Sequence, residues 1–233
     1  MTSKYRYLIP NGITFISLTC GIVSILLSAS NYLYPAGILI LCSYVLDLFD
    51  GAAARRLQAG SEFGLQLDSL VDMVSLGTAP TVLIFVHLQN EQVAPVLIWP
   101  TVVVFTLAGA FRLARFNLLP PKTSGSKDSM GLTITSGGAT LGLAVLSDIA
   151  RPMIELPDVL FIPFVLSVAA LMVSRVAFPS FTGIFASKRR NLVLVTMIGI
   201  SIIISTSFFN AWFFWNNTYL GYSLARAGYK RLG

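Results

Sequence analysis

Long apolar segments, each close to the length of a membrane-spanning helix, recur along the whole chain. A helix needs about 20 apolar residues to cross a bilayer. Only 11% of the 233 residues are charged and the mean hydropathy is +0.77, whereas a soluble domain averages about 25% charged residues. The sequence therefore predicts an all-α polytopic membrane helix bundle with about eight transmembrane helices. The expected spans are approximately residues 13–28, 34–55, 65–87, 93–115, 131–149, 159–176, 191–208 and 211–224.

The distribution of positive charge predicts the orientation of these spans. Cytoplasmic loops of membrane proteins are enriched in Lys and Arg. With eight spans and both the N- and C-termini cytoplasmic, all but one of the 16 Lys and Arg residues lie in or beside cytoplasmic segments, the exception being Arg151. Orientation and contact with anionic membrane lipids then explain the net charge of +6 without nucleic acid. We expect an integral protein of the cytoplasmic (inner) membrane of a prokaryote.

Four aspartates lie at the facing ends of the second and third expected spans. On a helix, Asp47 and Asp50 are i and i+3, and Asp68 and Asp72 are i and i+4, so each pair lies on one face. The link between them, roughly residues 56–64, is short and polar, so the two helices should run antiparallel with the pairs facing each other. A single aspartate in an apolar helix is often a hydrogen-bonded structural group, but four in register repel one another unless a cation lies among them. Oxygen-only ligands favour a hard divalent ion such as Mg2+ or Mn2+.

The residues from Asp47 to Asp72 follow the pattern D-x2-D-G-x2-A-R-x8-G-x3-D-x3-D. This stretch resembles the signature of the CDP-alcohol phosphotransferases, which are integral membrane enzymes of phospholipid synthesis. The resemblance implies a CDP-diacylglycerol donor and two divalent ions, Mg2+ or Mn2+, with Asp47, Asp50 and Asp68 as metal ligands. It assigns Asp72 both to a metal and to the general base. The distribution of Lys and Arg independently predicts that these aspartates, and thus the active site, face the cytoplasm.

The same resemblance implies a set of positions that bind the CDP-alcohol. Two small residues would let the nucleotide approach closely, another would ease helix packing, and an arginine on the same face could pair with the diphosphate. A serine in the connecting loop matches a donor-contacting position of some relatives. An asparagine at the inner end of the first span is either part of the nucleotide site or an ordinary helix cap. The two small residues near the nucleotide are Gly51 and Ala54, the residue that eases packing is Gly64, and the arginine is Arg55. The serine of the loop is Ser61, and the asparagine of the first span is Asn11.

The string from Phe111 to Asn117 resembles the phosphatidylserine synthase branch of this family, which implies L-serine as the acceptor. Within it, Arg112 and Arg115 are i and i+3 near the cytoplasmic end of the fourth span. They could bind the serine carboxylate or the donor phosphate, or they could reach the lipid heads as snorkelling groups. Members of that branch carry a Gly-Leu-Pro-type string at the start of the fifth span, where this chain has Gly-Leu-Thr at residues 131–133. Other acceptors, such as glycerol 3-phosphate or an inositol phosphate, therefore stay open.

We expect residues 1–190 to form the catalytic core with six transmembrane helices, and residues 191–233 to add two transmembrane helices and a basic cytoplasmic tail. The resemblance also implies a homodimer among membrane lipids. The alternatives are a cation transporter that uses the aspartates as an ion pathway, and a non-catalytic scaffold. The clustering of all four acids at one face, with no comparable acid at mid-membrane depth, favours an enzyme.

Two smaller features complete the expectations. Ser28-Ala29-Ser30 resembles a signal-peptide cleavage site, but we favour an uncleaved first span. His87 is the only histidine and lies at the far end of the third span from the aspartates. We expect it to be an interfacial side chain rather than a catalytic base.

Overall fold

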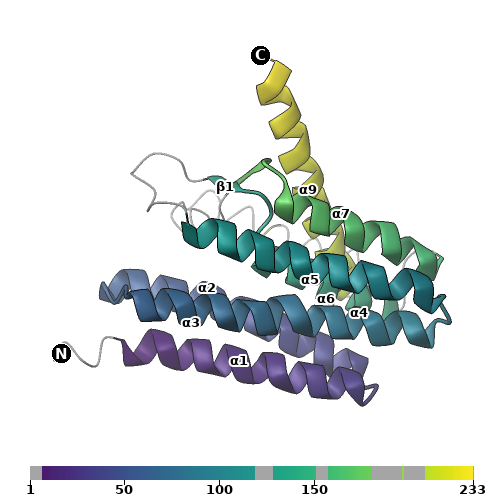
Figure 1. The fold of residues 1–233 in the computed structure, drawn as a ribbon, viewed down its shortest axis with the longest axis horizontal. Helices are drawn as coiled ribbons and strands as arrows, with labels where there is room; N and C mark the ends of the chain where they lie inside the picture. Colours follow the sequence, from purple (N-terminus) through teal and green to yellow (C-terminus); the bar gives the residue numbers. More distant parts are fainter. Residues whose placement is uncertain (1–6, 119–127, 151–156, 180–195, 197–207, 233) are drawn as a thin grey trace.

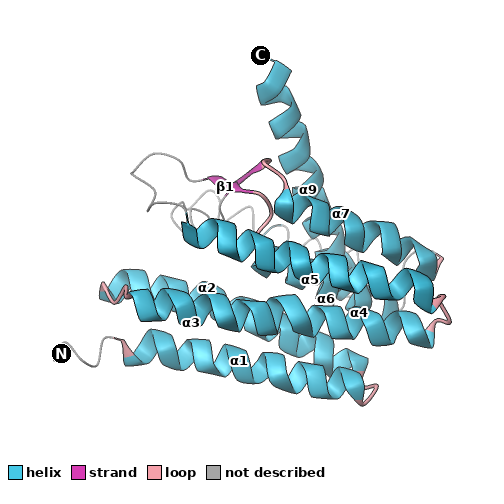
Figure 2. Ribbon diagram, viewed as in Figure 1, coloured by secondary structure: helices cyan, strands magenta, loops and turns pink. Residues whose placement is uncertain are grey.

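The computed structural model describes residues 7–118, 128–150, 157–179, 196 and 208–232 as a bundle of helices (Figures 1 and 2). A short antiparallel ribbon of two strands lies at one end of the bundle. The all-α membrane fold is thus confirmed apart from this ribbon, which the sequence did not predict. In chain order, the elements are α1 (Leu8–Ala29), α2 (Leu33–Leu57), α3 (Glu62–Asp72), η2 (Met73–Thr78), α4 (Ala79–Asn90), α5 (Pro95–Leu118), β1 (Asp128–Met130), α6 (Ile134–Ile149), η3 (Asp158–Leu160), α7 (Phe161–Val173), β2 (Ala177–Pro179) and α9 (Phe208–Leu232).

Four helical segments are long and apolar enough to cross a membrane. They are α1 with 22 residues, α2 with 25, the continuous helix Glu62–Asn90 with 29, and α5 with 24. α6 and the η3–α7 segment are shorter apolar helices, and the expected eighth span lies within α9. The predicted domain boundary at residue 190 and most of the seventh span, residues 191–208, lie outside the described residues.

Small polar side chains let the first two helices approach closely. The Ser17 and Ser43 hydroxyls are 2.6 Å apart, and Ser24 Oγ donates to the Ala36 carbonyl at 2.9 Å. Interfaces between membrane helices favour such small residues because lipid is as apolar as the core, so close packing must hold the helices together. α5 packs against α7, and α2 against α6. The N-terminal half of α9 joins α6 through Asn216, whose Nδ2 donates to Thr140 at 2.8 Å, while its C-terminal half projects from the bundle (Figure 1).

The turn between α2 and α3 is as short as the sequence predicts. α2 ends at Leu57, and Gln58 takes a left-handed conformation with φ of 50° that reverses the chain. Ser61 then caps α3, because its Oγ accepts a hydrogen bond from the Gly64 backbone N–H at 3.0 Å. This tight connection places the last two turns of α2 beside the first turns of α3.

A π-helical turn, η2, follows Asp72 directly and was not predicted. Thr78 Oγ1 donates to the Met73 carbonyl five residues earlier, at 3.0 Å. Pro80 lies two residues after this turn, and a proline has no N–H to donate and clashes with the carbonyl four residues before it in an ordinary α-helix. The wider turn removes that clash, and π turns of this kind are frequent at functional sites.

The structure excludes one of the two alternatives for Asn11 and contradicts the expectation for His87. α1 begins at Leu8 with Tyr7 as its N-cap, which makes no side-chain cap, so Asn11 lies inside the first turns of the helix and is not an ordinary cap. His87 is not interfacial, since only 2% of its side chain is exposed and it lies between α4 and its neighbours.

Candidate active site

Three of the four predicted aspartates converge between α2 and α3. One carboxylate oxygen from each of Asp47, Asp50 and Asp68 lies within 4.8 Å of the other two. At or below that separation each pair of negative charges repels by at least roughly 3.5 kcal/mol at an effective dielectric constant of about 20. No Lys or Arg of the described chain forms an ion pair with them. A cation held by these oxygens would remove the repulsion, so the donor set fits a hard divalent ion.

Asp72 supplies the fourth carboxyl group, one helical turn after Asp68. It is buried, with 7% of the residue exposed, and it interacts electrostatically with Asp47 of α2. Asp68 and Asp50 also act on it electrostatically, and so does the guanidinium of Arg112. The i, i+3 and i, i+4 spacings thus bring all four acids to one seam, as expected from the sequence.

Thr14 of α1 is a member of this cluster that the sequence analysis did not select. Its Oγ1 donates to Asp50 Oδ2 at 2.9 Å and lies 3.0 Å from the Pro10 carbonyl of its own helix. A hydroxyl has one proton, and a carboxylate is the stronger acceptor. Thr14 therefore fixes the Asp50 carboxylate from a third helix. The sequence feature that could have identified Thr14 is its position three residues after Asn11, which places both side chains on one face of α1.

Asn11, Ser61 and Gly64 lie together at the end of the seam. A side chain added at Gly64 would place its Cβ 3.1 Å from Ser61 Oγ and 3.7 Å from Asn11 Oδ1. Among the described residues the nearest atom from another helix belongs to Asn11 of α1, and none comes from α2, so the predicted role of Gly64 in packing the second and third spans stays a prediction. Two residues predicted to bind the donor, Asn11 and Ser61, therefore both lie close to this glycine.

Gly51 and Arg55 form a second neighbouring pair, on α2. A Cβ at Gly51 would lie 3.3 Å from an Nη of Arg55, so the exposed guanidinium lies over the glycine, and it also acts electrostatically on Asp50. Ala54 is partly buried beside them. A cationic group beside the acidic seam is suited to binding the phosphates of a ligand.

The two predicted arginines of α5 have different surroundings. Arg112 is 7% exposed and interacts electrostatically with Asp72 and Asp47, while its guanidinium lies 5.2 Å from the Phe116 ring centroid. Arg115 instead donates to the carbonyls that end α7, with 2.9 Å to Val173 O and 3.3 Å to Ser174 O. The structure therefore directs Arg112 to the aspartates and Arg115 to a helix C-terminus, where a cation is stabilising.

Asn117 in the same string ties α5 to the acidic helix. Its Nδ2 donates to Ser69 Oγ at 3.1 Å, and Ser69 directly follows Asp68. The sequence did not predict this contact, because it does not reveal which helix packs against the end of α5.

Comparison with known proteins shows the family to which this chain belongs. A sequence model of the CDP-alcohol phosphatidyltransferase family matches residues 7–176. CDP-diacylglycerol--serine O-phosphatidyltransferase of Helicobacter pylori (strain ATCC 700392 / 26695) is 31% identical over 199 residues, covering 84% of this chain and 81% of the relative. Archaetidylserine synthase of Methanothermobacter thermautotrophicus is 32% identical over 181 residues, with 77% and 72% covered. The Bacillus subtilis (strain 168) serine phosphatidyltransferase is 31% identical over 174 residues, with 74% and 90% covered. The chain therefore belongs to the CDP-alcohol phosphatidyltransferase family, a family of membrane enzymes.

Proposed function

We propose that this chain transfers the phosphatidyl group of CDP-diacylglycerol to the hydroxyl of L-serine, giving phosphatidylserine and CMP. The observation that carries the proposal is the meeting of four carboxyl groups and a buried arginine between α2, α3 and α5. Family membership supports the reaction type, and the relatives named serine phosphatidyltransferases and archaetidylserine synthase support the acceptor.

In this proposal Asp47, Asp50, Asp68 and Asp72 hold two divalent ions, Mg2+ or Mn2+. When bound, the ions neutralise charge on the phosphate oxygens and on the leaving CMP. The oxygen-only ligand set and the absence of an ion-paired Lys or Arg among the described residues support this assignment. The Thr14 hydroxyl orients Asp50 for it.

The remaining steps are assigned to this chain's own groups. Asp72 accepts the proton of the serine hydroxyl as its oxygen attacks the lipid-bonded phosphorus, and the bond from that phosphorus to CMP breaks. Arg55 pairs with the diphosphate, and Gly51 leaves the helix backbone open to the nucleotide. Arg112 binds the serine carboxylate, while the contacts of Arg115 suit a positioning role that holds α5 against α7. The other donor-binding positions are Asn11, Ala54, Ser61 and Gly64.

The proposed setting is the cytoplasmic membrane of a prokaryote, with eight spans, both termini cytoplasmic and the site open to soluble serine. The charge distribution along the sequence supports this orientation. We also expect a homodimer, to be checked by the mass of the detergent-solubilised chain in light scattering.

The test is release of CMP from CDP-diacylglycerol by the purified chain. We expect release that requires both L-serine and Mg2+ or Mn2+, with phosphatidylserine as the lipid product. Glycerol 3-phosphate and an inositol phosphate serve as competing acceptors. If either supports release and serine does not, the acceptor assignment is wrong; if no acceptor does, the enzymatic proposal itself fails.

A further inference from the structure

A second cluster of metal-ligating side chains lies at the other end of the bundle, away from the aspartate seam. His87 is in the last turn of α4, Asp148 in the last turn of α6, and Asp158 begins η3. The imidazole nitrogen and one oxygen of each carboxylate lie within 4.8 Å of one another. His87 lies fifteen positions after Asp72 along one continuous helix, which corresponds to roughly 20 Å. The two clusters are therefore separate sites.

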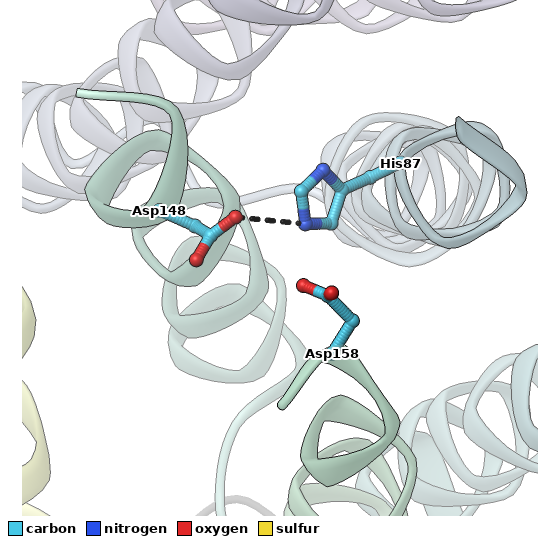
Figure 3. Close-up of side chains that lie close together, drawn as sticks. All are labelled: His87, Asp148 and Asp158. Atoms are coloured by element: carbon cyan, nitrogen blue, oxygen red, sulfur yellow. Dashed lines mark ion pairs between the residues drawn. The ribbon is translucent and has the colours of Figure 1, made fainter. Parts of the chain in front are cut away.

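The buried histidine is aimed into this cluster. Figure 3 shows both carboxyl groups turned toward the imidazole, with Nε2 facing Asp148. His87 is 2% exposed, and its Nε2 has no hydrogen-bond partner among the described residues. The ring is fixed in this orientation by edge contact with Phe161, at 5.1 Å between ring centroids. A buried ring nitrogen that faces two carboxylates without a hydrogen bond calls for a ligand.

An ion pair between His87 and one aspartate does not account for the arrangement. The Nε2 to Asp148 Oδ2 distance is 3.3 Å, which is also about the spacing of two ligands around a tetrahedral zinc ion with bonds of about 2.1 Å. A second carboxylate, that of Asp158, then adds repulsion that a histidine pair alone does not offset. The C-terminal ends of α4 and α6 meet here too, and each contributes a partial negative charge that favours a cation.

We propose that His87, Asp148 and Asp158 bind a zinc-type divalent transition-metal ion, with water as a fourth ligand. One imidazole nitrogen and two carboxylate oxygens suit Zn2+ better than Mg2+, which takes oxygen ligands. The ion would link α4, α6 and the start of α7 at the end of the bundle opposite the aspartates. The proposal does not depend on the reaction catalysed at the other end.

The single histidine of the chain makes the test direct. Full-length protein without a histidine tag, labelled with 15N-histidine, is titrated with Zn2+ in excess Mg2+, which occupies the oxygen-only cluster. We expect one equivalent of Zn2+ to bind and to shift the Nε2 resonance. Asp148→Asn and Asp158→Asn should each weaken zinc binding by at least about 10-fold.

Glu91→Gln is the matched control. Glu91 is an exposed acid four residues after His87 and outside the cluster, so this variant should bind zinc as the unaltered chain does. An unaltered chain whose histidine resonance does not respond to Zn2+ would overturn the proposal, whatever the variants do. The same conclusion follows if Asp148→Asn shows the full zinc response.

Discussion

The contact of Thr14 with Asp50 gives the sharpest prediction about the acidic seam. Thr14→Val keeps the shape of the side chain and removes its only proton donor. Asp50 is 6% exposed, so water has little access to replace the bond of 2.9 Å that Thr14 Oγ1 makes to Oδ2. A hydrogen bond to a charged group contributes roughly 1.5–3 kcal/mol. Since about 1.4 kcal/mol is a factor of ten, the loss corresponds to about 10- to 100-fold weaker metal binding, the range seen when a ligand-orienting group is removed.

The assay is CMP release as a function of Mn2+ concentration. We expect Thr14→Val to raise the Mn2+ concentration needed for half-maximal activity by about 10- to 100-fold, with much of the rate recovered at saturating Mn2+. Thr19→Val is the control, because Thr19 Oγ1 makes the same kind of bond to its own helix, at 2.9 Å to Phe15 O, but reaches no carboxylate. If the two variants respond to Mn2+ alike, Thr14 does not orient a metal ligand and the reasoning is wrong.

Three further outcomes are expected. Asp72→Asn should lower kcat by about 10²- to 10⁴-fold while the thermal midpoint stays near that of the unaltered chain, since it removes a proton acceptor from the proposed reaction; retained turnover would remove Asp72 as the base. Gly131→Ala should lower the free energy of unfolding by roughly 2 kcal/mol or more, because Gly131 has φ of 74° and a Cβ there would lie 2.6 Å from Met172 O. Gly12→Ala is the control and should not destabilise the chain, because a Cβ at Gly12 meets no neighbour within 4 Å. Thermal unfolding compares the two variants. Arg112→Gln should raise the KM for serine with little loss of stability. Arg115→Gln should lower the stability and leave the KM nearly unchanged, because it leaves the carbonyls at the end of α7 without their donor. If both variants change the KM and the stability equally, the two arginines do not have these separate roles.

The acidic seam was predictable because its information is local. Spacings of three and four residues place side chains on one helix face, and a link of a few polar residues forces neighbouring helices to run antiparallel. Asp47, Asp50, Asp68 and Asp72 therefore meet whatever the rest of the bundle does. The lengths of the apolar segments, which are also local information, gave the limits of α2 and α5 to within a few residues.

The contacts between distant helices could not be predicted in that way. In a membrane helix both the lipid-facing and the buried sides are apolar, so hydrophobic periodicity does not reveal which face packs inward. His87 was assigned to the interface from its position at the end of the third span, and its burial against neighbouring helices could not be predicted. The different surroundings of Arg112 and Arg115 could not be predicted either. Thr133 stands where the phosphatidylserine synthase branch has the proline of its Gly-Leu-Pro-type string. Its side chain caps α6 here by accepting a hydrogen bond from the Ser136 N–H at 3.1 Å.

The most direct measurement is anomalous X-ray diffraction from crystals of the full chain grown with Mn2+ and CDP-diacylglycerol. We expect two manganese peaks between α2 and α3, with Asp47, Asp50, Asp68 and Asp72 as their protein ligands and the diphosphate beside them. Manganese bound elsewhere, with these four carboxylates uncoordinated and the liponucleotide present, would contradict the proposed site.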